Sequence, residues 1–286
     1  EVNNILTSGF LFAFYSTYIT LYITERMKNM KKIIISDITL KKISEDRAVS
    51  LLFREKSAIA NCADTIGADV IEIGIPFSDP IAEGIVIQEA DIRALQAGVT
   101  TDKLFEMVVR VREKTQVPLV FMTYMNPIYT YGTERFLERC AQVGIDGVII
   151  PDVPYEEKEE INKECQKAGI ELISMIAPTS KERIHMIAGD AEGFLYCVSS
   201  LGVTGIRNKI TTDISEMIKQ VRQVSDIPCA IGFGIATPEQ AYEMAKIADG
   251  VIVGSAIVKI VAKYGKRSIE PVCQYIQTMK KAIRNA

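Results

Sequence analysis

The run VIEIGI at residues 70–75 carries the strongest structural signal in this 286-residue chain. One carboxylate interrupts a stretch that is otherwise apolar, and Pro76 ends it, which is typical of a strand buried on both faces. Because side chains alternate along a strand, Glu72 and Gly74 face one side and the isoleucines face the other. A carboxylate on a buried face must be paired, hydrogen-bonded or protonated. Glu72 is therefore either a functional group or a structural one held by a buried arginine or by backbone donors.

Similar apolar runs recur along the chain and alternate with amphipathic stretches of helical period. This alternation implies parallel strands with right-handed crossovers, and eight repeats close most economically into a (β/α)8 TIM barrel. The alternative is a doubly wound open sheet, which predicts a GxGxxG turn after the first strand, and the sequence has no such turn. The predicted strands are Ile33–Ser36, Val70–Ile75, Pro118–Thr123, Gly147–Ile150, Glu171–Ile176, Gly193–Val198, Pro228–Gly232 and Gly250–Val253.

Capping residues mark the helices predicted between these strands. Thr237-Pro238-Glu239 supplies an N-cap, a proline at the first helical position and an early acid. Gly144 and Gly169 end their helices just before the next strand. The predicted helices include Thr101–Thr115, Thr133–Val143, Tyr155–Ala168, Lys181–Ala188, Thr211–Val224 and Thr237–Ala248.

The first 30 residues do not fit the repeating pattern. The segment from Ile5 to Ile23 carries no charge and reaches the length of a membrane span, and basic residues follow it. Its many hydroxyl side chains favour a packed extension or a segment foreign to the native protein, and the acidic start at Glu1 argues against a signal peptide. We expect an irregular N-terminal extension over residues 1–30, no membrane partner, and one TIM-barrel catalytic domain over residues 31–286.

Composition narrows the classes of function. The chain is 48% hydrophobic and 24% charged, as globular proteins are, and its formal net charge of −3 gives no reason to expect nucleic acid as a partner. His185 is the only histidine, which excludes multi-histidine metal sites and argues against a Ser-His or Cys-His triad. We therefore expect no metal, and acid–base chemistry must come from carboxylates, Tyr, Lys or Cys. Six cysteines without a CxxC pair are interpreted as buried free thiols of a cytoplasmic protein.

Candidate catalytic groups lie where the predicted strands end, which is where TIM-barrel active sites are built. Glu72 lies in the second strand and Glu83 in the loop that follows it. One buried and one loop-borne carboxyl group can have different pKa values. One of them can then act as the general acid or base while the other stays ionised and accepts a hydrogen bond. Asp79, in the same loop, is better explained as a turn former. Asp152, after the fourth strand, is interpreted as a turn or supporting carboxylate.

Three further features point to a ligand. Tyr124 and Tyr196 follow or end the third and sixth strands, where each either lines the site or packs in the core. Gly234 and Gly254-Ser255 follow the last two strands, and Ser255 opens a helical run. Glycine lets backbone N–H groups approach an anion, and a helix start adds its dipole. Because the loops after strands seven and eight bind phosphate in this fold, we predict a phosphate site there, with simple turn glycines as the alternative.

Seven motifs together resemble the alpha subunit of tryptophan synthase. They are IEIGIPFSDPIAEG, MTYMNPIYTYG, DGVIIPDVPYEE, ISMIAPTS, YCVSSLGVTG, IGFGIATPEQ and VIVGSAIVKI, in order from about residue 63 to the C-terminus. The resemblance implies a TIM barrel that cleaves indole-3-glycerol phosphate to indole and glyceraldehyde 3-phosphate in tryptophan biosynthesis. It also implies a PLP-dependent beta subunit as partner, in an α2β2 assembly, and no cofactor in the alpha subunit itself.

The same resemblance assigns roles to individual residues. Glu72 matches the acid–base group, and Glu83 matches the carboxylate that serves the indole nitrogen. Tyr196 matches a tyrosine that lines the site, and phosphate binding falls to Gly205, Gly234, Gly254 and Ser255. We also predict that Tyr124, Thr204 and Phe233 bind the substrate.

The chain departs from the family pattern at three places. Glu83 stands where aspartate is usual and Ile85 where proline is usual, and residues 1 to about 54 do not match, which leaves Lys32–Ser36 as the substitute for the first strand. A misplacement of about 1 Å can cost about a hundredfold in rate. Two other hypotheses stay open. One is a catalytically impaired subunit that mainly binds and activates a beta subunit, and the other is a different phosphate-binding barrel lyase or isomerase.

Overall fold

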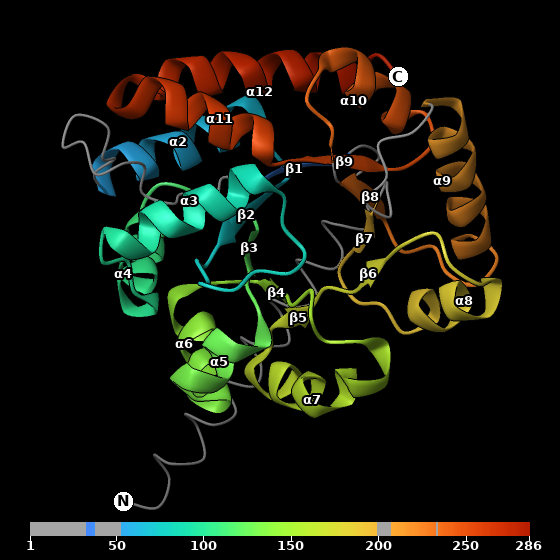
Figure 1. The fold of residues 1–286 in the computed structure, drawn as a ribbon, viewed down its shortest axis with the longest axis horizontal. Coiled ribbons are helices and arrows are strands. Elements are labelled where there is room, and N and C mark those ends of the chain that lie inside the picture. Colours follow the sequence, from blue (N-terminus) through green and yellow to red (C-terminus); the bar gives the residue numbers. More distant parts are fainter. Residues whose placement is uncertain (1–32, 38–52, 199–206, 233) are drawn as a thin grey trace, which may run out of the picture.

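The strands form a parallel barrel inside a ring of helices (Figure 1). The computed structural model describes residues 33–37, 53–198, 207–232 and 234–286. The strands are β1 (Ile33–Asp37), β2 (Val70–Gly74), β3 (Leu119–Met122), β4 (Gly147–Ile149), β5 (Glu171–Leu172), β6 (Met175–Ile176), β7 (Leu195–Val198), β8 (Cys229–Gly232) and β9 (Gly250–Val253).

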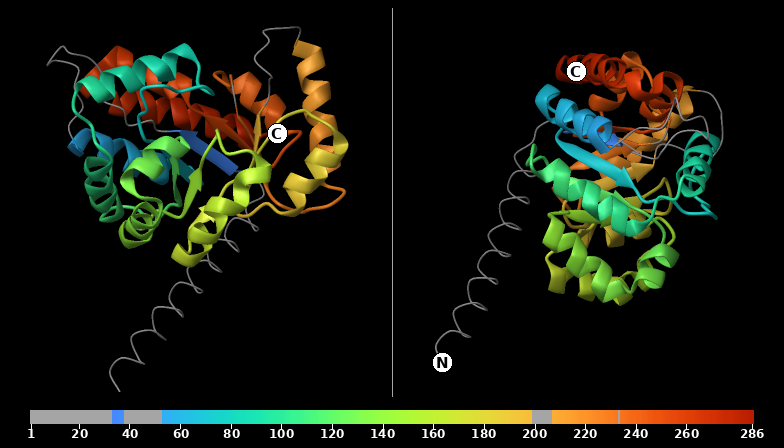
Figure 2. Two further views of the ribbon diagram at one scale, coloured as in Figure 1. Left: turned by 60° about the horizontal axis from the view of Figure 1, so that its bottom comes forward. Right: turned by 90° about the vertical axis from the view of Figure 1, so that its left-hand side faces the viewer.

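Helices connect successive strands and cover the outside of the barrel from all sides (Figure 2). They are α2 (Phe53–Ile66), α3 (Ile85–Gln96), α4 (Thr101–Arg112), α5 (Met125–Tyr131), α6 (Thr133–Val143), α7 (Lys158–Ala168), α8 (Lys181–Gly189), α9 (Arg207–Val221), α10 (Pro238–Ala245), α11 (Ser255–Tyr264) and α12 (Ile269–Arg284), with short 3-10 turns η1 (Tyr155–Glu157) and η2 (Gly265–Arg267).

The barrel closes through a break in its fifth strand. The hydrogen-bonded order is β5-β4-β3-β2-β1-β9-β8-β7-β6, and β5 and β6 are the two halves of the strand predicted over Glu171–Ile176. Between the halves, Ile173 donates its N–H to Val148 of β4 at 2.9 Å, and Ser174 accepts the Tyr196 N–H of β7 at 3.0 Å. The first half of this strand, β5, is thus hydrogen-bonded to β4, and the second half, β6, is hydrogen-bonded to β7. The predicted (β/α)8 barrel is confirmed, and the doubly wound alternative is wrong.

The strand predicted over Ile33–Ser36 completes the barrel on its other side. β1 pairs in parallel with β2, where Ile35 lies opposite Val70, and with β9, where Ile33 lies opposite Gly250. The segment that replaces the family's usual first strand therefore does form a strand.

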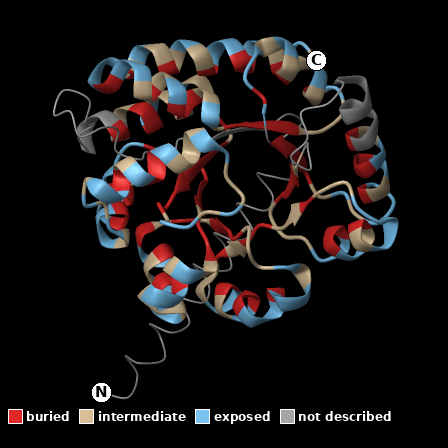
Figure 3. Cartoon of the chain, in the orientation of Figure 1, coloured by how far each residue is buried: buried red, intermediate tan, exposed pale blue. Residues whose placement is uncertain are grey.

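The strands are buried (Figure 3), and two apolar clusters share them. The larger one lies between the barrel and the helices, and it includes the outward-facing Ile71 and Ile73 of β2. The smaller one fills the barrel interior and consists of Val70, Val120, Ile149, Ile173, Phe194, Tyr196, Ala230 and Ile252. Burial on both faces explains why these strands read as continuous apolar runs.

The capping predictions are confirmed. Thr237 caps α10, because its hydroxyl accepts the Gln240 N–H at 3.3 Å while the Gln240 side chain accepts the Thr237 N–H at 3.1 Å. Gly144 and Gly169 end α6 and α7 with φ of +82° and +70°, the left-handed conformation that favours glycine.

The expectation of six free thiols is wrong for one pair. Cys62 of α2 and Cys273 of α12 form a disulfide with a Cα–Cα distance of 6.0 Å across a sequence separation of 211 residues. The two helices pack against each other, so the bond joins the first and last helices described. The other cysteines, Cys140, Cys165, Cys197 and Cys229, are free and buried, as expected.

The uncharged run Ile5–Ile23 and the predicted domain boundary after residue 30 lie outside the described residues. Within the described part of the chain, no helix combines the length and apolarity that crossing a bilayer requires. The division into 1–30 and 31–286 stays a prediction.

Candidate active site

Glu72 lies in the middle of β2, with only 1% of its surface exposed. It is two residues from Val70, which belongs to the cluster inside the barrel, and strand alternation places both side chains on the same face. Its backbone is held on both sides, because it is the register partner of Asp37 in β1 and of Val120 in β3. The barrel therefore presents a carboxyl group to its own interior.

Tyr196 reaches the same interior from β7, and its position depends on a glycine of the next strand. Its side chain is 6% exposed and belongs to the interior cluster. A β-carbon at Gly232 of β8 would lie 2.5 Å from the Tyr196 Oη and 2.7 Å from Cζ. Any other residue at Gly232 would displace the tyrosine ring. This role of Gly232 is invisible in the sequence, because only the distance between two strands reveals it.

Glu83 lies in the loop between β2 and α3, and the backbone on both sides of it is hydrogen-bonded. The Ala82 N–H donates to the Tyr124 Oη at 2.9 Å, and the Gln88 Nε2 donates to the Glu83 carbonyl at 2.7 Å. One oxygen of the Glu83 carboxyl group is buried. The loop is therefore tied to the residues that follow β3 and to the first turn of α3.

Tyr124 is the N-cap residue of α5, and 2% of it is exposed. Burial raises the pKa of Tyr124 to about 12, and the nearby Glu83 and Asp152 carboxylates contribute to the rise. Its ring lies 5.3 Å from that of Phe77 at the start of the loop. The hydroxyl thus contacts the loop backbone, and the predicted contact of Tyr124 with substrate remains a prediction.

Two other carboxylates have structural contacts. Asp152 accepts the Met125 N–H at 3.0 and 3.2 Å through its two oxygens, which satisfies a free donor at the start of α5. Asp79 is exposed and accepts the Ser78 hydroxyl at 2.5 Å within the loop. These contacts agree with the supporting and turn-forming roles expected for them.

The predicted phosphate residues follow adjacent strands. Gly234 comes just after β8, is exposed, and has a φ of +80°. Gly254 follows β9 and is the N-cap of α11, which begins at Ser255. The first helical bond recorded there runs from the Val258 N–H to the Gly254 carbonyl at 3.1 Å, so the N–H groups ahead of it point out of the helix start. Such an arrangement can bind an anion. Thr204, Gly205 and Phe233 lie outside the described residues.

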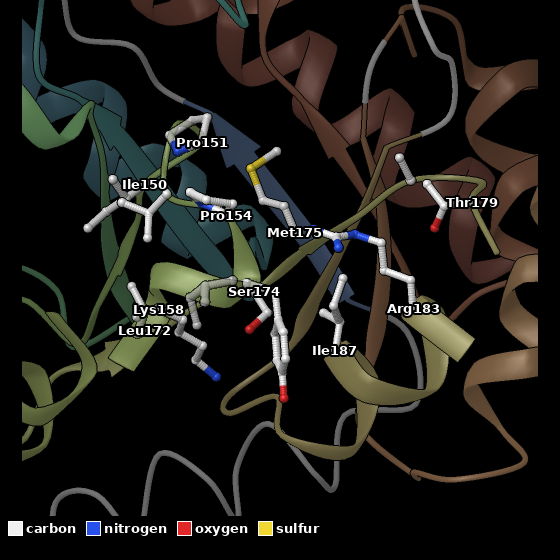
Figure 4. A pocket seen from close by; sticks show the side chains of 14 residues that line it. Ile150, Pro151, Pro154, Lys158, Leu172, Ser174, Met175, Thr179, Arg183 and Ile187 are labelled. Atoms are coloured by element: carbon white, nitrogen blue, oxygen red, sulfur yellow. The ribbon is translucent and has the colours of Figure 1, made fainter. Parts of the chain in front are cut away.

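A cavity of about 230 Å³ lies beside the fifth strand, between the loop after β4 and α8 (Figure 4). Both cations in its wall are paired, Arg183 with Glu156 at 2.5 Å and Lys158 with Asp190 at 2.9 Å. None of the predicted site residues lines it. Among the described side chains, no group of three or more His, Cys, Asp or Glu could hold a metal ion.

Comparison with known proteins identifies the family. The family model for the tryptophan synthase alpha chain matches residues 53–285. The chain belongs to the tryptophan synthase alpha chain family. It is 48% identical over 217 residues to the tryptophan synthase alpha chain of Lacticaseibacillus casei, covering 76% of this chain and 82% of that one. The alpha chain of Alkaliphilus metalliredigens is 49% identical over 215 residues, which is 74% of this chain and 81% of the relative.

Solved structures agree with this membership of the tryptophan synthase alpha chain family. The alpha subunit from Legionella pneumophila superposes with a TM-score of 0.80 at 33% identity, covering 92% of this chain and 98% of that one. A chain from a structural study of mutual activation in the tryptophan synthase α2β2 complex of Pyrococcus furiosus superposes with a TM-score of 0.76 at 31% identity, covering 87% and 97%.

Proposed function

We propose that this chain cleaves indole-3-glycerol phosphate to indole and glyceraldehyde 3-phosphate, as a carbon–carbon lyase of tryptophan biosynthesis. The observation that carries the proposal is Glu72, a carboxyl group 1% exposed inside a barrel whose family performs this reaction. A carboxyl group on a rigid strand suits proton transfer, because a catalytic acid or base must be held within hydrogen-bond reach of the proton that it transfers.

The reaction is a retro-aldol cleavage that needs two proton transfers. A proton adds to the indole ring carbon that bears the side chain, and a proton leaves the hydroxyl group on the adjacent side-chain carbon. The carbon–carbon bond then breaks, its electron pair returns to the ring, and the hydroxyl carbon becomes the aldehyde of glyceraldehyde 3-phosphate. We assign the acid–base role in these transfers to Glu72, with Tyr196 lining the same interior.

Glu83 acts on the opposite end of the indole ring. Protonation of the ring carbon places positive charge on the ring nitrogen, and a carboxylate that accepts the N–H bond stabilises that charge in the transition state. Cleavage of the carbon–carbon bond then returns its electron pair to the ring and restores aromatic indole, which keeps its N–H. A partly buried carboxylate, in a loop whose backbone is hydrogen-bonded at Ala82 and at Glu83 itself, supports this role.

The phosphate group is held at the ends of β8 and β9. Backbone N–H groups around Gly234 and at the start of α11 provide the donors, with Gly254 and Ser255 at the helix start. Thr204, Gly205 and Phe233 complete the substrate site in this proposal. Phosphate binding far from the reacting bond would fix the substrate's orientation.

The partner is a tryptophan synthase beta subunit, a PLP enzyme, in an α2β2 complex of the kind described for the Pyrococcus furiosus protein. Three large apolar side chains are exposed near the Glu83 loop and on α5: Ile81 at 80%, Ile85 at 66% and Tyr129 at 75%. Exposed large apolar side chains that lie close together are typical of protein interaction sites. We place the beta subunit there and expect the alpha chain itself to work without a cofactor.

We also propose a cytoplasmic location, since the pathway substrates are phosphorylated metabolites. The disulfide between Cys62 and Cys273 is unusual for that compartment, where thiols are kept reduced. We therefore expect Cys62 and Cys273 to be reduced, free thiols under cytoplasmic conditions.

Indole release from indole-3-glycerol phosphate by the purified chain tests the function directly. Turnover by the chain alone, increased by a beta subunit, is the expected result. Beta-subunit activation without any indole release would favour the impaired, activating subunit, which the unmatched N-terminal residues motivate. Cleavage of another sugar phosphate in its place would favour a different barrel lyase.

A further inference from the structure

Two hydrogen bonds attach the backbone around Glu83 to side chains outside its loop. The Ala82 N–H donates to the hydroxyl oxygen of Tyr124, 42 residues further along the chain, and the Gln88 side-chain amide on α3 donates to the Glu83 carbonyl. The two bonds come from different elements and lie at the two ends of the pair Ala82-Glu83. Glu83 is the candidate acceptor for the indole N–H.

We propose that Tyr124 and Gln88 are positioning residues for Glu83, which fix the loop backbone so that its carboxylate meets the indole nitrogen. This inference rests on the proposed function and deepens it, because it assigns to two residues a role that acts only through a third.

Tyr124 is itself held rigidly, which a positioning residue requires. Its side chain is 2% exposed, and its ring packs on Phe77 at 5.3 Å between centroids. The next residue, Met125, donates its N–H to both oxygens of Asp152 at 3.0 and 3.2 Å. The position of the Tyr124 hydroxyl is therefore set by the barrel and by α5. The loop takes its position from this hydroxyl through the hydrogen bond from the Ala82 N–H. Its pKa of about 12 keeps the hydroxyl neutral at any physiological pH.

Gln88 makes the second of the two hydrogen bonds that hold the Ala82-Glu83 backbone, and we call this pair of bonds the clamp. It lies in the first turn of α3, the helix that begins directly after the loop, and its bond of 2.7 Å closes the chain back on Glu83. The glutamate at this position is one methylene longer than the aspartate usual in the family. The backbone position therefore decides whether the carboxylate arrives where it is needed, and a shift of about 1 Å can cost about a hundredfold in rate.

The test is a set of double-mutant cycles on indole-3-glycerol phosphate cleavage by the full chain. Tyr124→Phe and Gln88→Met each remove one bond with little change in shape, and each is expected to lower kcat about tenfold with KM changed less than about twofold. In a Glu83→Gln background the same changes should produce no further loss, because there is no carboxylate left to position. Losses that add fully in that background, or unchanged kcat in the single variants, would overturn the inference.

Tyr131→Phe on α5 and Gln96→Met on α3 are matched controls on the same two helices, and both should keep wild-type kcat. Hydrogen exchange gives a readout that does not depend on catalysis. Exchange of the Ala82 amide should rise about tenfold or more in Tyr124→Phe, while the strands exchange as before. Unchanged exchange at Ala82 would contradict the clamp even if the wild-type chain proved inactive, whereas absent wild-type turnover alone would contradict only the proposed function.

Discussion

The two candidate carboxylates are held in place by different means. Glu72 sits in a strand whose backbone is paired with β1 on one side and β3 on the other, so many hydrogen bonds fix its position. Glu83 sits in a loop that two side chains, Tyr124 and Gln88, attach to the barrel. The strand-borne group is placed by the fold itself, and no single side-chain change elsewhere should move it. The loop-borne group depends on individual contacts and can be moved by one substitution or by a partner.

The largest expected effect is on the strand-borne group. Glu72→Gln keeps the shape of the side chain but removes the proton exchange, so indole release should fall by about a thousandfold or more, in line with the loss of a catalytic acid–base group. Glycerol phosphate binding, measured by calorimetry, should stay within about twofold. Glu89→Gln on the exposed face of α3 is the matched control. Retained turnover in Glu72→Gln would remove the residue from its assigned role.

The second effect concerns the phosphate end of the site, which like Glu72 depends on the backbone. Gly234→Val places a β-branched residue at a φ of +80° and crowds the N–H groups nearby, so glycerol phosphate affinity should fall about ten- to a hundredfold. Gly98→Val is the control, because Gly98 has a φ of +71° in an exposed turn remote from β8. It carries the same backbone strain and should leave binding unchanged. Equal affinity in both variants would contradict the phosphate site at Gly234.

The same contrast explains what could be predicted from the sequence. Features encoded in one segment were predictable: the strand around Glu72, with its single polar residue between apolar ones, and the glycines that end α6 and α7. The eight strands follow from periodicity, because burial on both faces demands continuous apolar runs. The break of the fifth strand into β5 and β6 was not predictable, since Ile173 and Ser174 differ little from their neighbours in composition.

Features that join distant segments left no local signal. The Cys62–Cys273 disulfide spans 211 residues, and only the packing of α2 on α12 brings the two together. Gln88 has the appearance of an ordinary helix residue until its bond to Glu83 is seen. Gly232 has a role only because Tyr196 on the adjacent strand lies so close. Side-chain contacts between elements depend on how the elements pack, which composition and spacing do not determine.

A smaller effect is expected from the partner. Binding of a beta subunit should change the position of the loop that carries Glu83 but not the position of Glu72 in its strand. Ile81 is 80% exposed and precedes Ala82, so a beta subunit that covers it would tighten the loop around Glu83. Ile81→Asp places a charge in that contact and should weaken beta-subunit binding about tenfold, since a buried unpaired charge opposes association. Activation of indole release by the beta subunit should fall accordingly, while turnover by the isolated chain stays within about twofold. Arg110→Asp, an exposed change on α4, is the control, and undiminished activation in Ile81→Asp would place the partner elsewhere.

The smallest effect on turnover should come from the interface between α2 and α12, which holds the Cys62–Cys273 disulfide and no catalytic group. Reduction of Cys62–Cys273 releases a constraint on a long loop of the unfolded chain, so the free energy of unfolding should fall by about 2–4 kcal/mol and Tm by several degrees. Indole release well below Tm should stay within about twofold, because β1, β2 and β9 remain paired without the bond. Thermal unfolding with and without reductant measures the first change, and Cys62→Ser with Cys273→Ser should reproduce it in the absence of reductant. If rapid alkylation of the purified chain finds six free thiols before any reductant is added, the disulfide is absent and packing alone holds α2 against α12.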